Sequence, residues 1–460
     1  MQRLYAIIWL TWKAAFRFRL IWVISALLVM AVVLLPLMIK HDGTARGFTQ
    51  ILLTYTLSAI TALLGISTLW LSCGTLSRDI EECQIQLVAT KPIPRWQIWL
   101  GKLVGIITLD LVMLALSGAA VYFLLIYRAG KLSEKEQAIL RNEVLVARSS
   151  LREPLPDLKP DVDRILKERL KSAQLSPDEI RDLRKQIEEQ VKAAHQIVPK
   201  DYRREWVIDA SKAMDSARLG RPLFLRVKFY AAQPTFGGSY LCIWRIGSDK
   251  SQRVVELEQN LPGETFNEFP IPPEVIGSDG KLVISFINRN QTALLFPLEE
   301  GFEVLYYEGG FAINFIRGLL IILFWLALLA AMGLAASSFL SFPVAAFATM
   351  SVMVLFFSSG MLRSSVEEQT VFGRDHETGK PINPLMDTLM LPVFKFTLKI
   401  VDLAQSFSPV DYLSAGRTIS WFDLLKAFLQ VVVFLGGIFA LIGISAFYRR
   451  ELANVQTSGP

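Results

Sequence analysis

Hydrophobic residues in this chain of 460 residues are gathered in long blocks that carry almost no charge, instead of recurring at amphipathic intervals. A helix needs about 20 mostly apolar residues to cross a bilayer, where no water is available to pair with its backbone. Six blocks reach that length: residues 20–39, 51–72, 103–127, 319–337, 343–362 and 427–448. The pattern predicts a polytopic α-helical membrane protein with six transmembrane helices.

Basic residues in the short segments around these blocks predict the orientation of the spans. Such residues concentrate on the cytoplasmic side of membrane proteins. Before the first block lie Arg3, Lys13, Arg17 and Arg19. Between the second and third blocks lie Arg78, Lys91, Arg95 and Lys102, and after the last block lie Arg449 and Arg450. Both termini are therefore expected in the cytoplasm, and the first block is expected to remain as a span because no convincing leader cleavage site follows it.

The segment before the first block has the pattern of an amphipathic helix. At 100° per residue, one face carries Leu4, Ile7, Ile8, Thr11, Ala15 and Phe18, and a flank carries Arg3, Lys13 and Arg17. A helix of this kind lies in the membrane interface. The alternative that it only lengthens the first span stays open.

A long polar insertion, residues 128–310, separates the third block from the fourth, so it is expected outside the cytoplasm. Residues 131–205 are expected to be helical, since Ser133 with Glu136 has the spacing of a capping box. Residues 221–300 hold short β-branched and aromatic runs between Gly, Pro, Asn and Asp, which predicts a small β-sandwich. We therefore expect an inserted extracytoplasmic α+β domain.

The remaining chain divides around this insertion. Residues 1–127 are expected to hold the interfacial helix, three spans and a cytoplasmic loop at 73–99, and residues 311–460 three more spans and the cytoplasmic C-terminus. The apolar patches in the outer loop 363–424 are too short to cross, and they favour partly buried or interfacial helices.

Composition narrows the chemistry further. The net charge of +6 does not indicate nucleic-acid binding, because the basic residues lie at the ends of blocks or among acidic ones. The three cysteines, Cys73, Cys83 and Cys242, and the three histidines, His41, His195 and His376, are widely separated. They indicate neither a disulfide framework nor a metal site.

The loop between the second and third blocks carries the most informative pattern. It runs from Ser77 to Trp96, with acidic residues first, Thr90-Lys91 near its end, and then Pro92-Ile93-Pro94. This order predicts a short cytoplasmic helix that ends at the prolines before the chain re-enters the membrane at Trp96. A rigid helix held at the membrane surface in this way can transmit a push from a cytoplasmic partner.

The same segment resembles the permeases of ABC type-2 transporters, whose usual wording is Ser-Arg-Glu-Ile-Glu, a Leu-rich helix, Lys-Pro, Arg-Trp and Gly-Lys. The matching positions are Ser77, Arg78, Asp79, Ile80, Glu81, Leu87, Lys91, Pro92, Arg95, Trp96, Gly101 and Lys102. Glu82-Cys83-Gln84 departs from the family's small Gly-Thr step. The resemblance extends over all six blocks, with residues 337–343 as a second short cytoplasmic turn, and is closest to the branch named for multicopper-enzyme maturation. The insertion is not part of the family pattern.

The resemblance implies that the chain is the permease subunit of an ABC transporter and that it works as an exporter in a bacterial inner membrane. It implies that Ser77, Arg78, Asp79, Ile80, Glu81, Leu87, Lys91, Pro92, Arg95 and Trp96 couple the chain to an ATPase subunit. Two ATPase copies and a second permease, as a homodimer or a heterodimer, would complete the complex, and a periplasmic protein could dock on the insertion.

A P-loop is not found in the chain, so we expect no catalytic residues and no cofactor on it. The nearest approach, from Gly373 to Gly379-Lys380-Pro381, has one residue too many and a proline where Ser or Thr must bind magnesium. ATP and magnesium are therefore expected on the partner subunit.

Two further features leave alternatives open. Asp110 lies inside the third block, where a charge is costly and a functional role is suspected, but it could also lie near the headgroups or be hydrogen-bonded between helices. Trp244 and Tyr240 could form a binding platform, although aromatic residues on sandwich strands more often belong to the core.

Rival functions are a scaffold or sensor that acts through its outer domain, and a membrane-bound enzyme, for which neither HExxH nor GxSxG is present.

Overall fold

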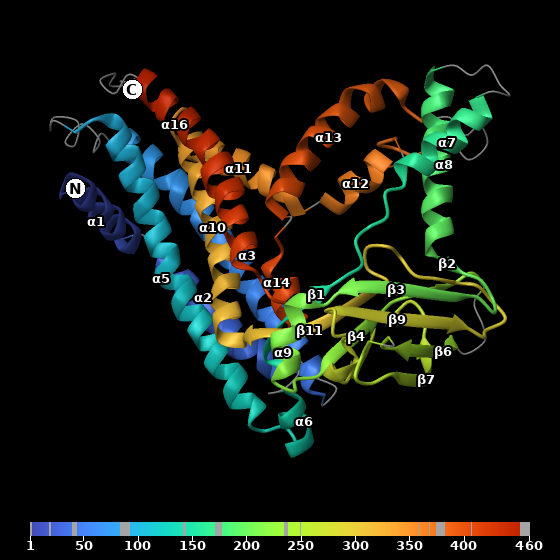
Figure 1. Cartoon of the computed structure of the whole chain (residues 1–460). Helices are drawn as coiled ribbons and strands as arrows, with labels where there is room; N and C mark the ends of the chain where they lie inside the picture. The colour runs from blue at the N-terminus through green and yellow to red at the C-terminus, as the bar shows by residue number, and fades with distance from the viewer. Residues whose placement is uncertain are drawn as a thin grey trace. The chain divides into compact units, whose positions relative to one another are not determined.

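The computed structural model in Figure 1 describes all of the chain except residues 1, 18–19, 39–43, 83–92, 141–143, 171–176, 234–237, 249, 358, 368, 374–381, 406 and 451–460. It divides into two compact units. The helical unit comprises Met1–Leu145 and Gly310–Pro460, and the inserted unit comprises Val146–Gly309.

Long apolar helices dominate the helical unit. Four described segments are long and apolar enough to cross a membrane: α3 (Ala45–Glu81), α5 (Arg95–Ala129), α10 (Phe311–Ser337), and the run of α15 (Trp421–Ala427), the π-helix η4 (Phe428–Gly436) and α16 (Gly437–Arg449). Two bent pairs are further candidates: α1 (Gln2–Arg17) with α2 (Leu20–Met38), at 74°, and α11 (Phe342–Phe357) with α12 (Ser359–Glu367), at 60°. The described chain thus offers four spans, or six if each bent pair is one span.

The first helix packs on α5 through the face that its sequence pattern predicted. Ile7, Thr11 and Ala15 are all buried. A Cβ atom added at Gly101 of α5 would lie 2.7 Å from Ile7 Cγ2, and one added at Gly105 would lie 2.8 Å from Thr11 Cβ. Because only glycine permits so close an approach, α1 buries this face against α5 instead of turning it toward lipid.

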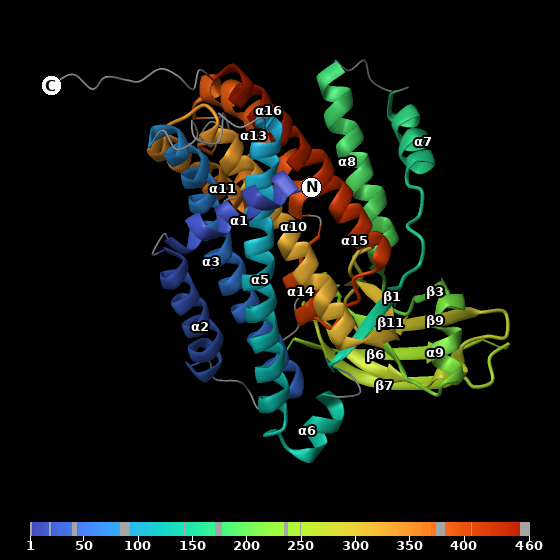
Figure 2. The ribbon, with the colours of Figure 1, turned by 90° about the vertical axis from the view of Figure 1, so that its left-hand side faces the viewer.

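The helices α3, α5 and α10 form the centre of the helical unit, and Figure 2 shows them side by side. Leu53, Leu57 and Ile60 of α3 are fully buried in this cluster. Small residues again set the spacing, since a Cβ atom at Gly333 of α10 would lie 1.8 Å from Ser72 Oγ. Close packing at small residues is the usual basis of helix association in apolar surroundings, where burial from water is not available as a driving force.

Two four-stranded sheets make the inserted unit a β-sandwich around one hydrophobic core. The strand order of one sheet is β1 (Val146–Leu151), β11 (Phe302–Gly310), β4 (Leu223–Val227) and β8 (Asn267–Ile271). The strand order of the other sheet is β3 (Arg203–Asp209), β9 (Lys281–Asn288), β6 (Ser239–Ile246) and β7 (Val255–Pro262). A small third sheet holds β2 (Ile197–Val198), β10 (Leu294–Leu295) and β5 (Tyr230–Ala231). Trp206 stacks on Phe302 with ring centroids 4.2 Å apart, and Trp244 is fully buried beside them. Tyr240 is also buried, so both aromatics singled out in the sequence belong to the core.

The boundary of the inserted unit differs from the expected residue 128. Ala129, Leu140 and Val144 bury their side chains against Ala45 of α3, so this stretch, with the short helix α6 (Glu134–Ile139), belongs to the helical unit. The segment expected to be helical also contains the strand β1. Its partner β11 comes about 150 residues later, so a local pattern gave no sign of the pairing. Since β1 and β11 are neighbours, the chain enters and leaves the unit side by side.

Helices α7 (Lys159–Leu170) and α8 (Pro177–Gln196) lie in the segment expected to be helical and pack on each other within the inserted unit. Val162 and Leu166 meet Ile187 and Val191 there.

In the segment 363–424, apolar patches that were expected to form partly buried or interfacial helices belong to one helix, α13 (Pro384–Gln405). It continues through Pro392 even though proline cannot supply the backbone N–H that a helix interior uses. The short helix α14 (Pro409–Ser414) follows it.

Candidate functional site

The loop 77–96 is carried by the two longest helices among the described residues. Ser77 to Glu81 form the last turns of α3, and Arg95 begins α5 after Pro94. The sequence pattern placed Asp79 and Glu81 at the start of a separate helix, but the structure continues α3 through them. Leu87, Lys91 and Pro92 lie outside the described residues, as does the helix that was expected to contain them.

The length of α3 and α5 bears on what this loop can do. At about 1.5 Å per residue, helices of 37 and 35 residues are about 55 and 52 Å long. The hydrocarbon core of a bilayer is only about 30 Å thick. Both helices therefore exceed one membrane thickness, and the described ends of the loop are continuous with rigid elements.

The end of α3 packs against the turn between α10 and α11. Ser77 Oγ donates a hydrogen bond to the carbonyl oxygen of Leu340, over 3.5 Å, and the backbone N–H of Phe342 donates to Glu81 Oε1 over 3.2 Å. The guanidinium of Arg78 lies over the Phe342 ring, 4.8 Å from its centroid. Three residues of the loop thus contact the second turn, residues 337–343, that the sequence singled out.

A nearly buried ion pair joins α3 to α5. Lys102 Nζ lies 2.5 Å from Asp79 Oδ2 and also donates to the carbonyl oxygen of Thr75, over 3.0 Å. The Lys102 side chain is 8% exposed and that of Asp79 is 28% exposed. An ammonium this deeply buried needs its partners, because removing one leaves a charge that water cannot fully solvate.

Arg95 joins the start of α5 to the end of α16. Its Nη1 donates to the carbonyl oxygens of Phe447, Tyr448 and Arg450, over 3.0, 2.8 and 3.1 Å. Helix-terminal carbonyls have no partner within their helix, and a cation stabilises the negative end of the helix dipole. Arg450 in turn donates to the carbonyl oxygens of Ser337 and Ser338 at the end of α10.

Two tryptophans near this junction differ in exposure. Trp99 is fully buried, donates from Nε1 to Ser338 Oγ over 3.2 Å, and leaves no room for a side chain at Gly443. Trp96 is 43% exposed. Sequence reasoning missed Trp99, for which the available signal was an indole with a polar edge near the predicted membrane boundary, and it used Arg450 only to orient the spans. Ile80, which the sequence did select, is half-buried.

Asp110 lies in α5, two turns beyond Lys102, and is buried. The Thr68 hydroxyl of α3 lies 3.0 Å from Asp110 Oδ2 and donates to it. The structure therefore shows the hydrogen bond between helices that was one of the sequence alternatives. Within the described residues, no group of three His, Cys, Asp or Glu side chains could hold a metal ion.

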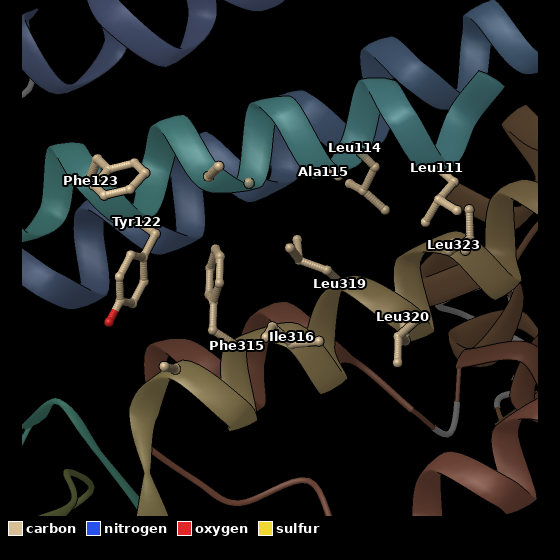
Figure 3. A pocket seen from close by; sticks show the side chains of 13 residues that line it. Leu111, Leu114, Ala115, Tyr122, Phe123, Phe315, Ile316, Leu319, Leu320 and Leu323 are labelled. Carbon is tan, nitrogen blue, oxygen red and sulfur yellow. The ribbon is translucent and has the colours of Figure 1, made fainter. Parts of the chain in front are cut away.

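An apolar cavity of about 390 Å³ lies between α5 and α10. Figure 3 shows the rings of Tyr122 and Phe315 toward one end and leucine side chains, among them Leu111 and Leu323, toward the other. The Tyr122 hydroxyl is the one polar side-chain group among the 13 lining residues. Such a lining accepts apolar groups and gives an ion nothing to coordinate.

The cysteines offer no reactive centre among the described residues. Cys73 and Cys242 are buried and free of disulfides, and Cys83 lies outside the described part of the chain. Burial in the sandwich core raises the pKa of the Cys242 thiol to about 12, which keeps it protonated. His195 lies 4.0 Å from Asp161, whereas His41 and His376 are not among the described residues.

No protein-family model matches this chain, and no curated protein or solved structure is significantly similar to it.

Proposed function

We propose that this chain is the permease subunit of an ABC transporter, acting as an exporter in a bacterial inner membrane. The observation that carries the proposal is the bracing of the loop 77–96, whose sequence resembles a coupling helix. Its described ends contact the ends of three other helices, and they are continuous with helices longer than a bilayer is thick.

This arrangement suits a mechanical coupling. The Asp79–Lys102 pair ties α3 to α5, Arg95 ties α5 to α16, and Arg450 ties α16 to α10. Densely packed helices transmit a displacement because they shift as units between discrete arrangements. A partner that pushes on the loop would therefore move the ends of four helices together.

The partner in this proposal is an ATPase subunit, present in two copies, which binds ATP and magnesium. A second permease chain would complete the membrane path, and both termini would face the same cytoplasmic side as the loop. The inserted unit would then lie on the outer side, where a periplasmic protein could dock. The candidate spans and the separately folded inserted unit are consistent with this assembly.

Trp96 provides the most direct test, because a docking residue must be exposed and a structural residue need not be. The full chain would be co-expressed with candidate P-loop ATPases of its source organism, purified with any that binds, and reconstituted in nanodiscs. We expect Trp96→Ala to abolish the ATPase's stimulation by the chain and to weaken co-purification. The matched control is Trp22→Ala, an exposed tryptophan (65%) on α2, which should leave both unchanged.

Failure of any ATPase to co-purify with the unmodified chain, or equal behaviour of the Trp96 and Trp22 variants, would refute the coupling role. Stimulation that depends on Trp96, in vesicles where no candidate solute crosses, would instead support a scaffold that transmits force to a partner without forming a path.

A further inference from the structure

A second apolar cavity in the helical unit, of about 330 Å³, has features of a lipid site that the transport proposal does not use. Its walls come from α3, α10, α11, α13, η4 and α16. Helices from both halves of the chain therefore build it, and none of the described residues of the loop 77–96 lines it.

The lining of this cavity is uncharged and almost wholly apolar. Leu326, Leu328 and Met332 of α10 are buried and form its deep part. Thr61 is one of two hydroxyl-bearing residues among the described residues of the lining, and its hydroxyl donates to the carbonyl oxygen of Leu57. A polar ligand would lose its hydration here without compensation, whereas a hydrocarbon would not.

The cavity opens at the surface of the helical unit. Val352 and Leu355 of α11 and Phe396 of α13 line it and are exposed, Phe396 by 66%. An apolar cavity of about 150 Å³ takes up a benzene molecule, so one of about 330 Å³ has room for about twice as many carbon atoms. An acyl chain that enters through this mouth fits both the volume and the lining.

Two exposed lysines on α13 supply the charge for a head group. Lys395 and Lys399 directly precede the lining residues Phe396 and Ile400, and lie one helical turn apart. Neither lysine forms an ion pair with a described residue, whereas Asp402 on the same helix pairs with Arg363. A helix with exposed apolar residues beside lysines is the pattern that binds anionic lipid surfaces.

We propose that this cavity binds one acyl chain of an acidic phospholipid, whose phosphate is held by Lys395 and Lys399. The binding is a property of the chain itself and does not depend on the ATPase or on transport.

The test uses delipidated full-length protein in detergent, titrated with phosphatidylglycerol and, separately, with phosphatidylcholine of the same acyl chains. Native mass spectrometry counts the bound lipids. We expect one tightly held phosphatidylglycerol per chain, and weaker binding of phosphatidylcholine. Ala62→Phe, which fills the cavity, should weaken phosphatidylglycerol binding by about tenfold or more.

The matched control is Ile66→Phe, an exposed position on the same helix outside the lining, which should bind as the unmodified chain does. The double variant Lys395→Gln, Lys399→Gln should lose the preference for phosphatidylglycerol. Equal lipid binding by the Ala62 and Ile66 variants would overturn the cavity site, and equal binding of the two lipids by the unmodified chain would overturn the role of the lysines.

A second measurement covers the case in which Ala62→Phe does not fold. Trp325 lines the cavity, so phosphatidylglycerol with brominated acyl chains should quench its fluorescence. The quenching that the unmodified chain shows and Trp325→Phe does not show is the quenching of Trp325. Absence of such a difference would also refute the proposal.

Discussion

Asp79→Asn tests whether the ion pair between α3 and α5 supports the loop. In the folded protein this change leaves the Lys102 ammonium nearly buried without an opposite charge, beside neutral acceptors such as the carbonyl oxygen of Thr75. Breaking a fully buried pair by removing one partner costs roughly 3–5 kcal/mol. Since Asp79 is 28% exposed and water can partly replace it, we expect a smaller loss, about 2 kcal/mol, in the free energy of unfolding.

The reverse change should cost less. Lys102→Met leaves the aspartate unpaired, but this carboxylate is the more exposed partner and keeps part of its hydration. We expect a loss of about 1 kcal/mol. In the double variant no buried charge remains, so its loss should be smaller than the sum of the two single losses.

Unfolding in mixed detergent micelles, followed by tryptophan fluorescence, measures all four proteins of this cycle. A loss for Asp79→Asn no greater than that for Lys102→Met would refute the argument from unequal burial. Additive losses would show that the two side chains do not interact, despite the 2.5 Å between their charged atoms.

Three other predictions follow from close contacts and burial. Gly101→Val should detach α1 from α5, because its added carbons would overlap Ile7, and should expose α1 to limited proteolysis, which Gly130→Val should not do. Arg95→Gln should lose the bonds to the α16 carbonyls and let carboxypeptidase trim the C-terminal helix faster, and an unchanged rate would refute this role. Cys242 should resist thiol reagents in the folded chain at about pH 8 and react after unfolding. The labelling that is absent from unfolded Cys242→Ala identifies the signal of this residue. Because burial raises the pKa of this thiol from 9.0 to about 12, only the unfolded state ionises just above pH 9. The contribution of this thiol to stability should then be constant below about pH 9 and be lost as the pH rises toward 12, by about 1.4 kcal/mol per pH unit at most, so that stability falls less over this range in Cys242→Ala.

Local patterns predicted the elements of this protein well wherever neighbours along the chain determine them. Uninterrupted apolar blocks predicted the long helices, since length and hydropathy are properties of a single segment. The 100° spacing predicted the face of α1 that is buried at Ile7 and Ala15. Short β-branched and aromatic runs between turn residues predicted the strand around Trp244, whereas the choice between a binding platform and the core for this residue was decided by the structure, which buries it.

Contacts between distant segments were decided only by the tertiary structure. Nothing near Arg95 in the sequence indicates that it binds carbonyl groups of α16, more than 350 residues away. The strand β1 is stabilised by pairing with β11, and the helical unit extends to Leu145 because the side chains before it are buried against Ala45. Neither contact produces a periodic pattern in the sequence nearby. The apolar cavity behind Phe396 likewise exists only where six helical segments meet.

The sequence by itself therefore predicted the long apolar helices, the presence of a β-sandwich and the segment that resembles a coupling helix, because each depends on residues within a few turns or strands. Only the tertiary structure decided that this segment is braced by an ion pair and by the ends of α10 and α16. Such bracing depends on which residues from distant helices approach within hydrogen-bond distance, and that is set by packing of the whole unit.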